Sequence, residues 1–426
     1  MLDINMFRDN VDDIRADHDK RKIPHDNINE VIRLDQKWRK ARYDADILRK
    51  ARNAAARGIA EAKKTGDLKM VDEIMSEIAS IGSEIDELGL LADECLSRRD
   101  AIRMKIPNIL HQSVPIGEDD QKNTLHSLHG DKIELGFEAK NHNDILEENG
   151  WVDLVRAAKI SGSRFYFLKG DLARLEMALQ IYCSNFLIER KYTLIQPPLM
   201  MNKESYEGVT DLDDFETVMY GIEPDKYYLI ATSEHPLTAM RMDEIIEPSE
   251  LPIRLVGVSP CFRREVGAHG LSDRGIWRVH QFTKIEQVII CNPDDSWKHH
   301  EDLLQNAIDL WDSLELHYRV VNICTGDMGT VASKKYDLEA WLPGAGEYKE
   351  VVSCSNCTDY QANRLRIRYR TSKGNSAVHT LNSTAVATSR ALVAIMEQYQ
   401  NKKGQIMIPK VLRPLMNNQE YLEPMA

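Results

Sequence analysis

The chain has 426 residues, 42% of them hydrophobic and 29% charged, which predicts a globular protein of two or three domains with a buried core. Its 55 basic and 67 acidic residues give a net charge of −12. This balance excludes nucleic-acid binding through net charge, so any RNA binding requires a local basic patch.

Cysteine usage and hydropathy indicate the compartment. The seven cysteines show no disulfide-like spacing, which favours a reducing environment. The first five residues lack the basic start and apolar run of a signal peptide. No stretch approaches the roughly 18 apolar residues of a membrane span. The sequence therefore predicts a cytoplasmic protein without a membrane segment.

Residues 28–105 are predicted to form two long helices. Proline is absent between Pro24 and Pro107, and apolar residues recur at alternating spacings of three and four, as in a coiled coil. The positions in the two halves are Val31, Leu34, Trp38, Ala41, Ala45, Leu48 and Ala55, then Val71, Ile74, Ile78, Ile81, Ile85, Leu88, Ala92 and Cys95. Thr65-Gly66-Asp67 interrupts the pattern with turn chemistry. We expect an antiparallel helical hairpin inside an N-terminal domain, residues 1–106.

The charges of this hairpin are divided unequally. Residues 37–64 contain ten Lys or Arg and three Asp or Glu, whereas residues 67–94 contain nine acids and one lysine. One interpretation is that the two helices pair by charge. The other is that cations crowded towards the turn bind RNA phosphates; these are Arg49, Lys50, Arg52, Arg57, Lys63 and Lys64. Both interpretations can hold together.

After Pro107 the composition changes. Residues 107–150 are rich in Pro, Gly, Asn and His and are predicted to be a connecting segment. Residues 151–426 alternate β-rich and helical runs. The expected strands are 192–195, 227–230, 254–259, 282–291 and 318–323, and the expected helices are 171–190 and 296–313. Because strands adjoin without regular helical crossovers, we expect an α+β fold with an antiparallel sheet and flanking helices.

A possible nucleotide site lies within residues 262–282. The chain has no Walker-type loop and no Gly-x-Gly-x-x-Gly turn, so side chains would have to hold ATP. Two strand-like runs flank a loop with Gly267, Gly270 and Gly275. Arginines at such a hairpin can bind phosphate through two hydrogen bonds. Arg-x-Glu by itself is a weak pattern, for which a surface ion pair is the default explanation.

The whole stretch resembles the second signature motif of class II aminoacyl-tRNA synthetases, specifically of the seryl-tRNA synthetase family. Residues 191–198, Lys-Tyr-Thr-Leu-Ile-Gln-Pro-Pro, look like the first motif, which forms the dimer. Residues 381–392 look like the third motif, with Ala385, Ala387 and Ser389 at its usually glycine-rich positions. Residues 161–168, 232–234 and 350–356 are also similar to seryl-type segments. The resemblance covers nearly the whole chain.

The resemblance implies a role for each matching residue. Arg263, Arg390 and Glu286 would be catalytic. The ATP-binding residues would be Arg263, Arg264, Glu265, Arg278, Val279, Phe282, Glu350, Val351, Val352, Ser353 and Arg390, with Glu350 and Ser353 as Mg²⁺ ligands. The serine-binding residues would be Thr232, Ser233, Glu234, Arg263, Glu286, Asn382 and Thr384. Either Asn382 or Thr384 would close the pocket for the serine hydroxyl.

The implied activity is ATP-dependent activation of L-serine and its transfer to tRNA(Ser), and also to tRNA(Sec), by a homodimer whose hairpin binds tRNA. Two rival hypotheses are an amino-acid ligase that loads a carrier protein and a non-catalytic paralogue that binds RNA. The first lacks a full hairpin. The second would not need to retain five charged ATP- and serine-site residues: Arg263, Glu265, Glu286, Glu350 and Arg390.

Two further patterns have plain explanations. Cys354-x-x-Cys357 supplies only two of the four ligands of a structural zinc site, and no matching pair follows, so buried free thiols are expected. His299 and His300 are adjacent on a predicted helix and face different ways, which favours a solvated face.

Overall fold

The computed structural model describes residues 1–210, 218–265 and 275–425, and these divide into two compact units, Met1–Ile109 and Leu110–Ala426. Gly267 and Gly270 of the expected ligand loop lie outside the described residues. Among the helices that are described, none is both long and apolar enough to cross a membrane.

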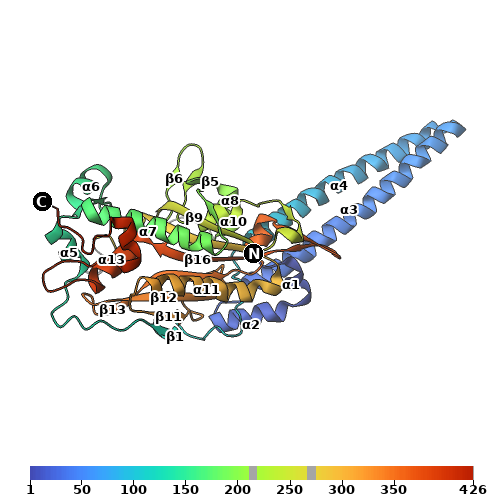
Figure 1. Ribbon diagram of the computed structural model, residues 1–426. Helices are drawn as coiled ribbons and strands as arrows, with labels where there is room; N and C mark the ends of the chain where they lie inside the picture. The colour runs from blue at the N-terminus through green and yellow to red at the C-terminus, as the bar shows by residue number, and fades with distance from the viewer. Residues whose placement is uncertain (211–217, 266–274, 426) are drawn as a thin grey trace. The chain divides into compact units, whose positions relative to one another are not determined.

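The first unit confirms the helical hairpin. It contains α1 (Ile4–Asp9), α2 (Val11–Arg21), α3 (Asp26–Thr65) and α4 (Leu68–Arg103), and α3 and α4 run side by side as two long antiparallel helices (Figure 1). Gly66 ends α3 in the left-handed conformation, at φ 75°, where a residue without Cβ is favoured. Asp67 caps α4 by accepting a hydrogen bond from the Met70 amide at 3.0 Å.

The hairpin is held together by its heptad residues and by one buried ion pair. Val31, Leu34 and Ala45 of α3 are buried, as are Ile85 and Ala92 of α4. At the end of the hairpin away from the turn, the Arg99 guanidinium lies 2.7 Å from the Asp35 carboxylate. Arg8 of α1 binds the same carboxylate at 2.8 Å, which satisfies a charge that would otherwise be costly to bury.

The second unit is built on an eight-stranded sheet with the order β1-β11-β12-β13-β16-β10-β9-β4. All pairings are antiparallel except β4 with β9. In this order the strands are Thr124–His129, Tyr318–Asn322, Lys334–Leu342, Glu347–Asn356, His379–Ala387, Gln281–Cys291, Ile253–Phe262 and Thr193–Ile195. The antiparallel α+β fold is therefore confirmed, and β1 places part of segment 107–150 at the sheet edge.

Smaller elements surround this sheet. The helices are α5 (His142–Asn149), α6 (Leu154–Ser161), α7 (Gly170–Glu189), α8 (Lys203–Val209), α10 (Glu234–Ala239), α11 (Ser296–Ser313), α12 (Tyr360–Leu365) and α13 (Thr388–Gln398). The short strands are β2 (Val152–Asp153), β3 (Phe167–Leu168), β5 (Met200–Asn202), β6 (Gly221–Ile222), β7 (Tyr227–Leu229), β8 (Ile245–Ile246), β14 (Arg368–Thr371) and β15 (Gly374–Ala377). Short 3-10 turns complete the unit: η1 (Asp120–Lys122), η2 (Pro248–Glu250), η4 (Pro293–Asp295) and η5 (Lys410–Met416).

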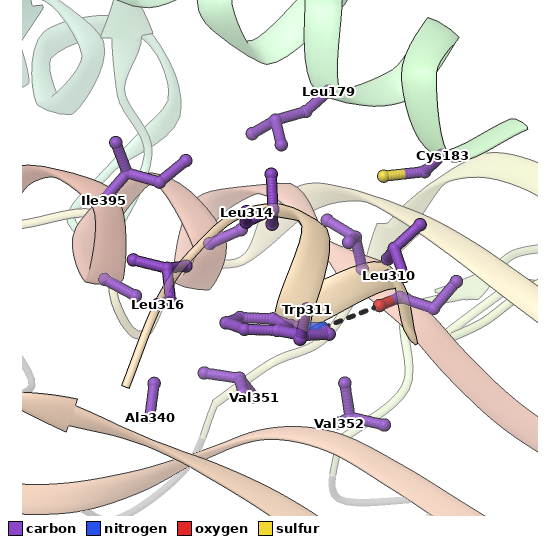
Figure 2. Packing of buried hydrophobic residues seen from close by; sticks show 14 of the residues in the cluster. Leu179, Cys183, Leu310, Trp311, Leu314, Leu316, Ala340, Val351, Val352 and Ile395 are labelled. Atoms are coloured by element: carbon purple, nitrogen blue, oxygen red, sulfur yellow. Dashed lines mark hydrogen bonds between the residues drawn. The ribbon is translucent and has the colours of Figure 1, made fainter. Parts of the chain in front are cut away.

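The main core lies between one face of the sheet and the helices α7, α11 and α13. Figure 2 shows Trp311 of α11 between Leu179 of α7 and Ile395 of α13 on one side and Val352 of β13 on the other. Because side chains alternate along a strand, burial of this face directs the intervening residues to the opposite face. That opposite face carries the polar residues described next.

Two of the β-bulges in this sheet break the alternation near the polar face. Along β10 and β16, Ile285 pairs with Val386 but Glu286 pairs with Thr384, so Ala385 is the extra residue. Along β12 and β13, Leu338 pairs with Val352 but Glu339 pairs with Glu350. Bulges re-aim neighbouring side chains, and both lie beside the polar cavity.

Candidate active site

A cavity of about 390 Å³ lies on the polar face of the central strands. On β10, Ile285 is in the core, whereas Lys284 and Glu286 line the cavity. On β13, Val352 is in the core and Ser353 lines the cavity. The cavity is also lined by Val209, Thr210, Glu234, His235, Arg263, Phe282, Gly329, Thr330, Val331, Ala332, Lys335, Glu350, Val351, Ser355, Cys357, Asn382, Thr384, Ala387 and Arg390.

Two carboxylates and a lysine mark one part of the cavity. The Lys284 ammonium lies 2.7 Å from the Glu286 carboxylate, and both side chains are almost fully buried. Glu234, at the start of α10, accepts a hydrogen bond from the Asn382 amide at 3.0 Å and one from the Gln361 amide at 3.3 Å. These carboxylates can bind an ammonium group, and the amide groups orient them.

Burial sets the protonation of these carboxylates. The pKa of Glu286 is raised to about 7, chiefly by burial and also by the charge of Glu234, against the lowering effects of Lys284 and of a hydrogen bond from Thr384. Burial also raises the pKa of Glu234, against the opposing charges of Lys284 and Arg263 and the hydrogen bond from Gln361. The positive charge of Lys284 thus opposes the rise in the pKa of both carboxylates.

Arginines and aromatic rings mark another part of the cavity. Arg263 follows β9, donates from Nε to the Ala231 carbonyl at 3.2 Å and lies 5.4 Å from the centre of the Phe282 ring. Arg390 of α13 donates to the Glu350 carbonyl at 2.8 Å and lies 5.5 Å from the centre of the Trp277 ring. Two guanidinium groups near aromatic faces can bind a nucleotide through its phosphates and its base.

Glu350 and Ser353 are close to a second acidic group. Asp337 of β12 pairs directly with Ser353 of β13 and lies 3.5 Å from Lys335. Burial raises the pKa of Asp337. Burial opposes ionisation of Glu350 as well, but Arg390 and Lys335, with two more cations of the cavity, lower its pKa. An ionised carboxylate and a hydroxyl that line one cavity suit Mg²⁺, which binds few protein oxygens together with substrate phosphates.

The structure brings most of the predicted site residues together. Ten line the main cavity: Glu234, Arg263, Phe282, Glu286, Glu350, Val351, Ser353, Asn382, Thr384 and Arg390. Glu265 and Val279 line a small adjoining cavity with Arg263, Trp277, Phe282, Ser389 and Arg390. Arg278 donates a hydrogen bond to Glu265 at 3.4 Å, so it borders this second cavity.

Besides Arg278, four predicted residues do not line either cavity. Val352 is part of the hydrophobic core. The Ser233 hydroxyl is buried 3.5 Å from the Gly257 carbonyl, and the Thr232 hydroxyl accepts from the Glu234 amide at 3.2 Å. Both of these residues support the turn into α10. The Arg264 amide donates to the Val218 carbonyl at 2.7 Å.

Sequence reasoning missed several cavity residues. Lys284 could have been found, because it alternates with Phe282 and Glu286 on the same strand. Trp277 lies within the predicted nucleotide stretch, residues 262–282, but was not singled out there. Lys335 and the loop 329–332 come from distant parts of the chain and carried no local signal. The Cys357 thiol, also in the cavity, accepts a hydrogen bond from Asn382 at 3.7 Å. Burial raises the pKa of the thiols of both Cys354 and Cys357.

The cations of the hairpin are accessible in the first unit. Lys50, Arg57, Lys63 and Lys64 are exposed, and Arg52 is half-buried. None of these five forms an ion pair with any residue that the structure describes, whereas Arg49 pairs with Asp46 of its own helix at 2.6 Å. Pairing between the two helices by charge therefore does not account for these cations. The described ion pairs that join α3 to α4 lie at the other end, at Asp35–Arg99 and Glu30–Arg98.

An antiparallel sheet covered by helices on one face, with a cavity of arginines, aromatic rings and carboxylates on the other, defines a class II aminoacyl-tRNA synthetase. Residues 218–399 match the tRNA synthetase class II core domain (G, H, P, S and T), and residues 1–110 match the seryl-tRNA synthetase N-terminal domain. The chain belongs to the seryl-tRNA synthetase family.

Individual relatives agree over the full length. The chain is 51% identical over 429 residues to the serine–tRNA ligase of Methanocella arvoryzae, covering 99% of this chain and 100% of that protein. It is 44% identical over 424 residues to the enzyme of the same name from Nitrosopumilus maritimus, with the same coverage. The crystal structure of seryl-tRNA synthetase from Pyrococcus horikoshii complexed with ATP is 42% identical, with a TM-score of 0.94 over 100% of both chains. The predicted enzyme class, serine–tRNA ligation, is confirmed.

Proposed function

We propose that this enzyme converts L-serine and ATP into seryl-adenylate and pyrophosphate, and then transfers serine to tRNA(Ser) and to tRNA(Sec). The observation that carries the proposal is the cavity itself. It joins an ammonium-binding group of carboxylates, Glu234 and Glu286, to a phosphate-binding pair of guanidinium groups, Arg263 and Arg390. For serine and ATP to react, the serine carboxylate has to lie beside the α-phosphate of ATP, between these two groups of residues.

The residue roles follow from charge and position. Glu234 and Glu286 bind the serine ammonium, and Arg263 binds both the serine carboxylate and the α-phosphate. The carboxylate oxygen attacks the α-phosphorus while the bond to the pyrophosphate oxygen breaks. Such a step needs alignment and charge neutralisation more than a general base. Phe282 stacks on adenine, Glu265 accepts from its amino group, and Arg390 neutralises the departing pyrophosphate.

Mg²⁺ is bound by Glu350 and Ser353. The support is the lowered pKa of Glu350, which keeps a hard, anionic oxygen in the same cavity that Ser353 lines. When bound, the ion supplies further neutralisation of the ATP phosphates. Lys335 lies on the neighbouring strand, β12, and its positive charge contributes to the lowered pKa of Glu350.

Selection of serine depends on polar groups that only a hydroxyl can satisfy. Asn382 donates to Glu234, so its amide nitrogen is already committed. Thr384 pairs with Glu286 across the bulge and hydrogen-bonds its carboxylate, so these two residues form the hydroxyl pocket. Alanine would leave buried polar groups unpaired, which costs more than the extra methyl group of threonine.

The hairpin is the tRNA-binding arm. This assignment is supported by the exposed cations between Lys50 and Lys64, which have no carboxylate partner among the described residues. Local positive charge is what an enzyme of net charge −12 requires in order to bind RNA phosphates. All seven cysteines are free and buried, which agrees with a reducing, cytoplasmic location.

The enzyme acts as a homodimer. Met177 and Ile181 lie one turn apart on α7 and are 63% and 47% exposed, and Leu194 of β4, in the first-motif segment, is 47% exposed. Exposed apolar groups of this kind are typical of a protein interface. Met177→Glu with Ile181→Glu should yield monomers in sedimentation equilibrium, whereas Leu90→Glu on the hairpin, also at an exposed apolar residue, should not. A dimeric double variant would contradict this interface.

The decisive experiment is transfer of labelled serine to tRNA, with ATP and Mg²⁺ present. Label on tRNA(Ser) and on tRNA(Sec) transcripts is expected, together with serine-dependent ATP–pyrophosphate exchange. Exchange without transfer to either RNA would refute the tRNA step while retaining activation. If neither reaction occurs with folded enzyme, the proposed activity is wrong.

A further inference from the structure

Gln361 of α12 is buried beside the cavity without lining it, being only 1% exposed. Its amide nitrogen donates to the Val209 carbonyl at 2.9 Å and to the Glu234 carboxylate at 3.3 Å. Its amide oxygen accepts from the Thr380 hydroxyl at 2.6 Å. One side chain therefore joins the end of α8, the start of α10 and strand β16.

The orientation of this amide is determined by its partners. A backbone carbonyl can only accept a hydrogen bond, so the nitrogen of Gln361 must face Val209. Glu234 lies on the same side and receives the second hydrogen of that nitrogen. The Thr380 hydroxyl completes the arrangement by donating to the oxygen on the other side.

Gln361 and Asn382 both donate to the same oxygen of Glu234, Oε1. With Oε1 held by two amides, the rotation of the carboxylate is restricted. Glu234 itself lines the cavity, and no hydrogen bond to its Oε2 is found among the described residues. The second oxygen is therefore left to interact with a molecule in the cavity.

We infer that Gln361 is a positioning residue for serine: it holds Glu234 so that Oε2 is presented to the serine ammonium. The inference rests on the proposed function, because it assigns the ammonium to this carboxylate. Because Gln361 does not line the cavity, we expect it to contact neither serine nor ATP. Its contribution should therefore appear in the KM for serine and not in the KM for ATP.

The test is Gln361→Met, which keeps the length of the side chain and removes both polar atoms. Loss of a hydrogen bond to a charged group corresponds to a rise in the KM for serine of roughly 10-fold to 100-fold. The KM for ATP should change less than twofold. Both constants are measured by ATP–pyrophosphate exchange, with the melting temperature recorded for each variant.

The matched control is Gln398→Met. Gln398 is also a buried glutamine that bonds three backbone groups, at His317 N, His317 O and Trp341 O, but it lies outside the cavity. It should lower the melting temperature without raising the KM for serine. A similar rise in both variants would reduce Gln361 to a structural role.

A double-mutant cycle separates positioning from general destabilisation. In a Glu234→Gln background, Gln361→Met should raise the KM for serine less than twofold, because the carboxylate that it positions is gone. A full additional rise would overturn the inference.

Thr380→Val supplies a second variant should Gln361→Met fail to fold, since it removes only the hydroxyl that orients the amide. A smaller rise in the KM for serine is expected, and an unchanged KM would overturn the inference. If the unaltered enzyme shows no serine-dependent exchange, the proposed function fails first.

Discussion

The indole Nε1–H of Trp311 donates a hydrogen bond to the Ala385 carbonyl at 3.1 Å (Figure 2). Ala385 is the extra residue of the bulge between β10 and β16, so its carbonyl is outside the regular ladder. Trp311 of helix α11 thus provides a hydrogen-bond donor for the Ala385 carbonyl, which the bulge removes from the regular ladder. This hydrogen bond therefore links the hydrophobic core to the bulge beside the cavity.

Trp311→Phe tests this connection. The change removes the donor, leaves a buried carbonyl unsatisfied and reduces the volume of a fully buried side chain. We expect the free energy of unfolding to fall by about 2–4 kcal/mol. Urea denaturation followed by circular dichroism measures it. Trp297→Phe, at a half-buried tryptophan of the same helix, is the control and should cost less than half as much.

The fold could be predicted in detail wherever its signal was local. The heptad pattern predicted the helical hairpin. Helix α3 begins at Asp26 and α4 ends at Arg103, each within two residues of the predicted limits, 28 and 105. The helix expected at 296–313 is α11, and the strand expected at 282–291 is β10, one residue longer. Strand order was not predictable, because pairing of β13 with β16 depends on side chains far apart in sequence.

The main errors of the sequence-based predictions concerned polar side chains that are buried in the structure. His299 and His300 were expected on a solvated face, and that prediction was wrong: both are buried, and His300 lies 5.4 Å from Tyr336 in a stacked arrangement. Helical spacing alone does not reveal that a sheet covers this part of α11. Lys284 was missed for a related reason, because a lysine inside a strand is normally exposed and only its partner Glu286 explains its burial.

Lys284→Met should shift the pH dependence of serine activation. The pKa of Glu286 is raised to about 7, chiefly by burial, although the charge of Lys284 opposes the rise. Removing the ammonium raises this pKa further, so Glu286 is protonated over a wider range and binds the serine ammonium only at higher pH. The acidic limb of kcat/KM for serine, measured by pyrophosphate exchange, should move upward. Lys284→Arg retains the charge and should move it little; an unshifted limb in Lys284→Met would refute this role.

Arg263→Ala should lower the rate of serine activation by roughly 100-fold or more, as expected for removing a preorganised group that stabilises transition-state charge. Arg254→Ala, on strand β9, which Arg263 follows, but away from the cavity, is the matched control and should retain activity. Near-normal ATP–pyrophosphate exchange in Arg263→Ala would show that this guanidinium does not act on the α-phosphate.

Separation of the two units predicts that activation and tRNA charging can be uncoupled. Deletion of residues 35–95 should abolish charging and leave activation largely intact, because every residue of the cavity belongs to the second unit. Loss of serine-dependent exchange in the deleted enzyme would show instead that the catalytic unit needs the arm for its own stability.

Charge substitution on the hairpin gives a finer test. Lys50, Arg57, Lys63 and Lys64 are changed together to Gln, which removes four exposed cations while preserving helix propensity. If they bind phosphates, tRNA affinity falls and the slope of log K against log salt becomes shallower by up to about 3. Filter binding across a salt series measures both quantities, and pyrophosphate exchange should not change. Arg33→Gln with Lys40→Gln, at cations already paired with Glu30 and Asp44, should alter the slope little. An equal effect of the two sets would mean that RNA does not select the unpaired cations.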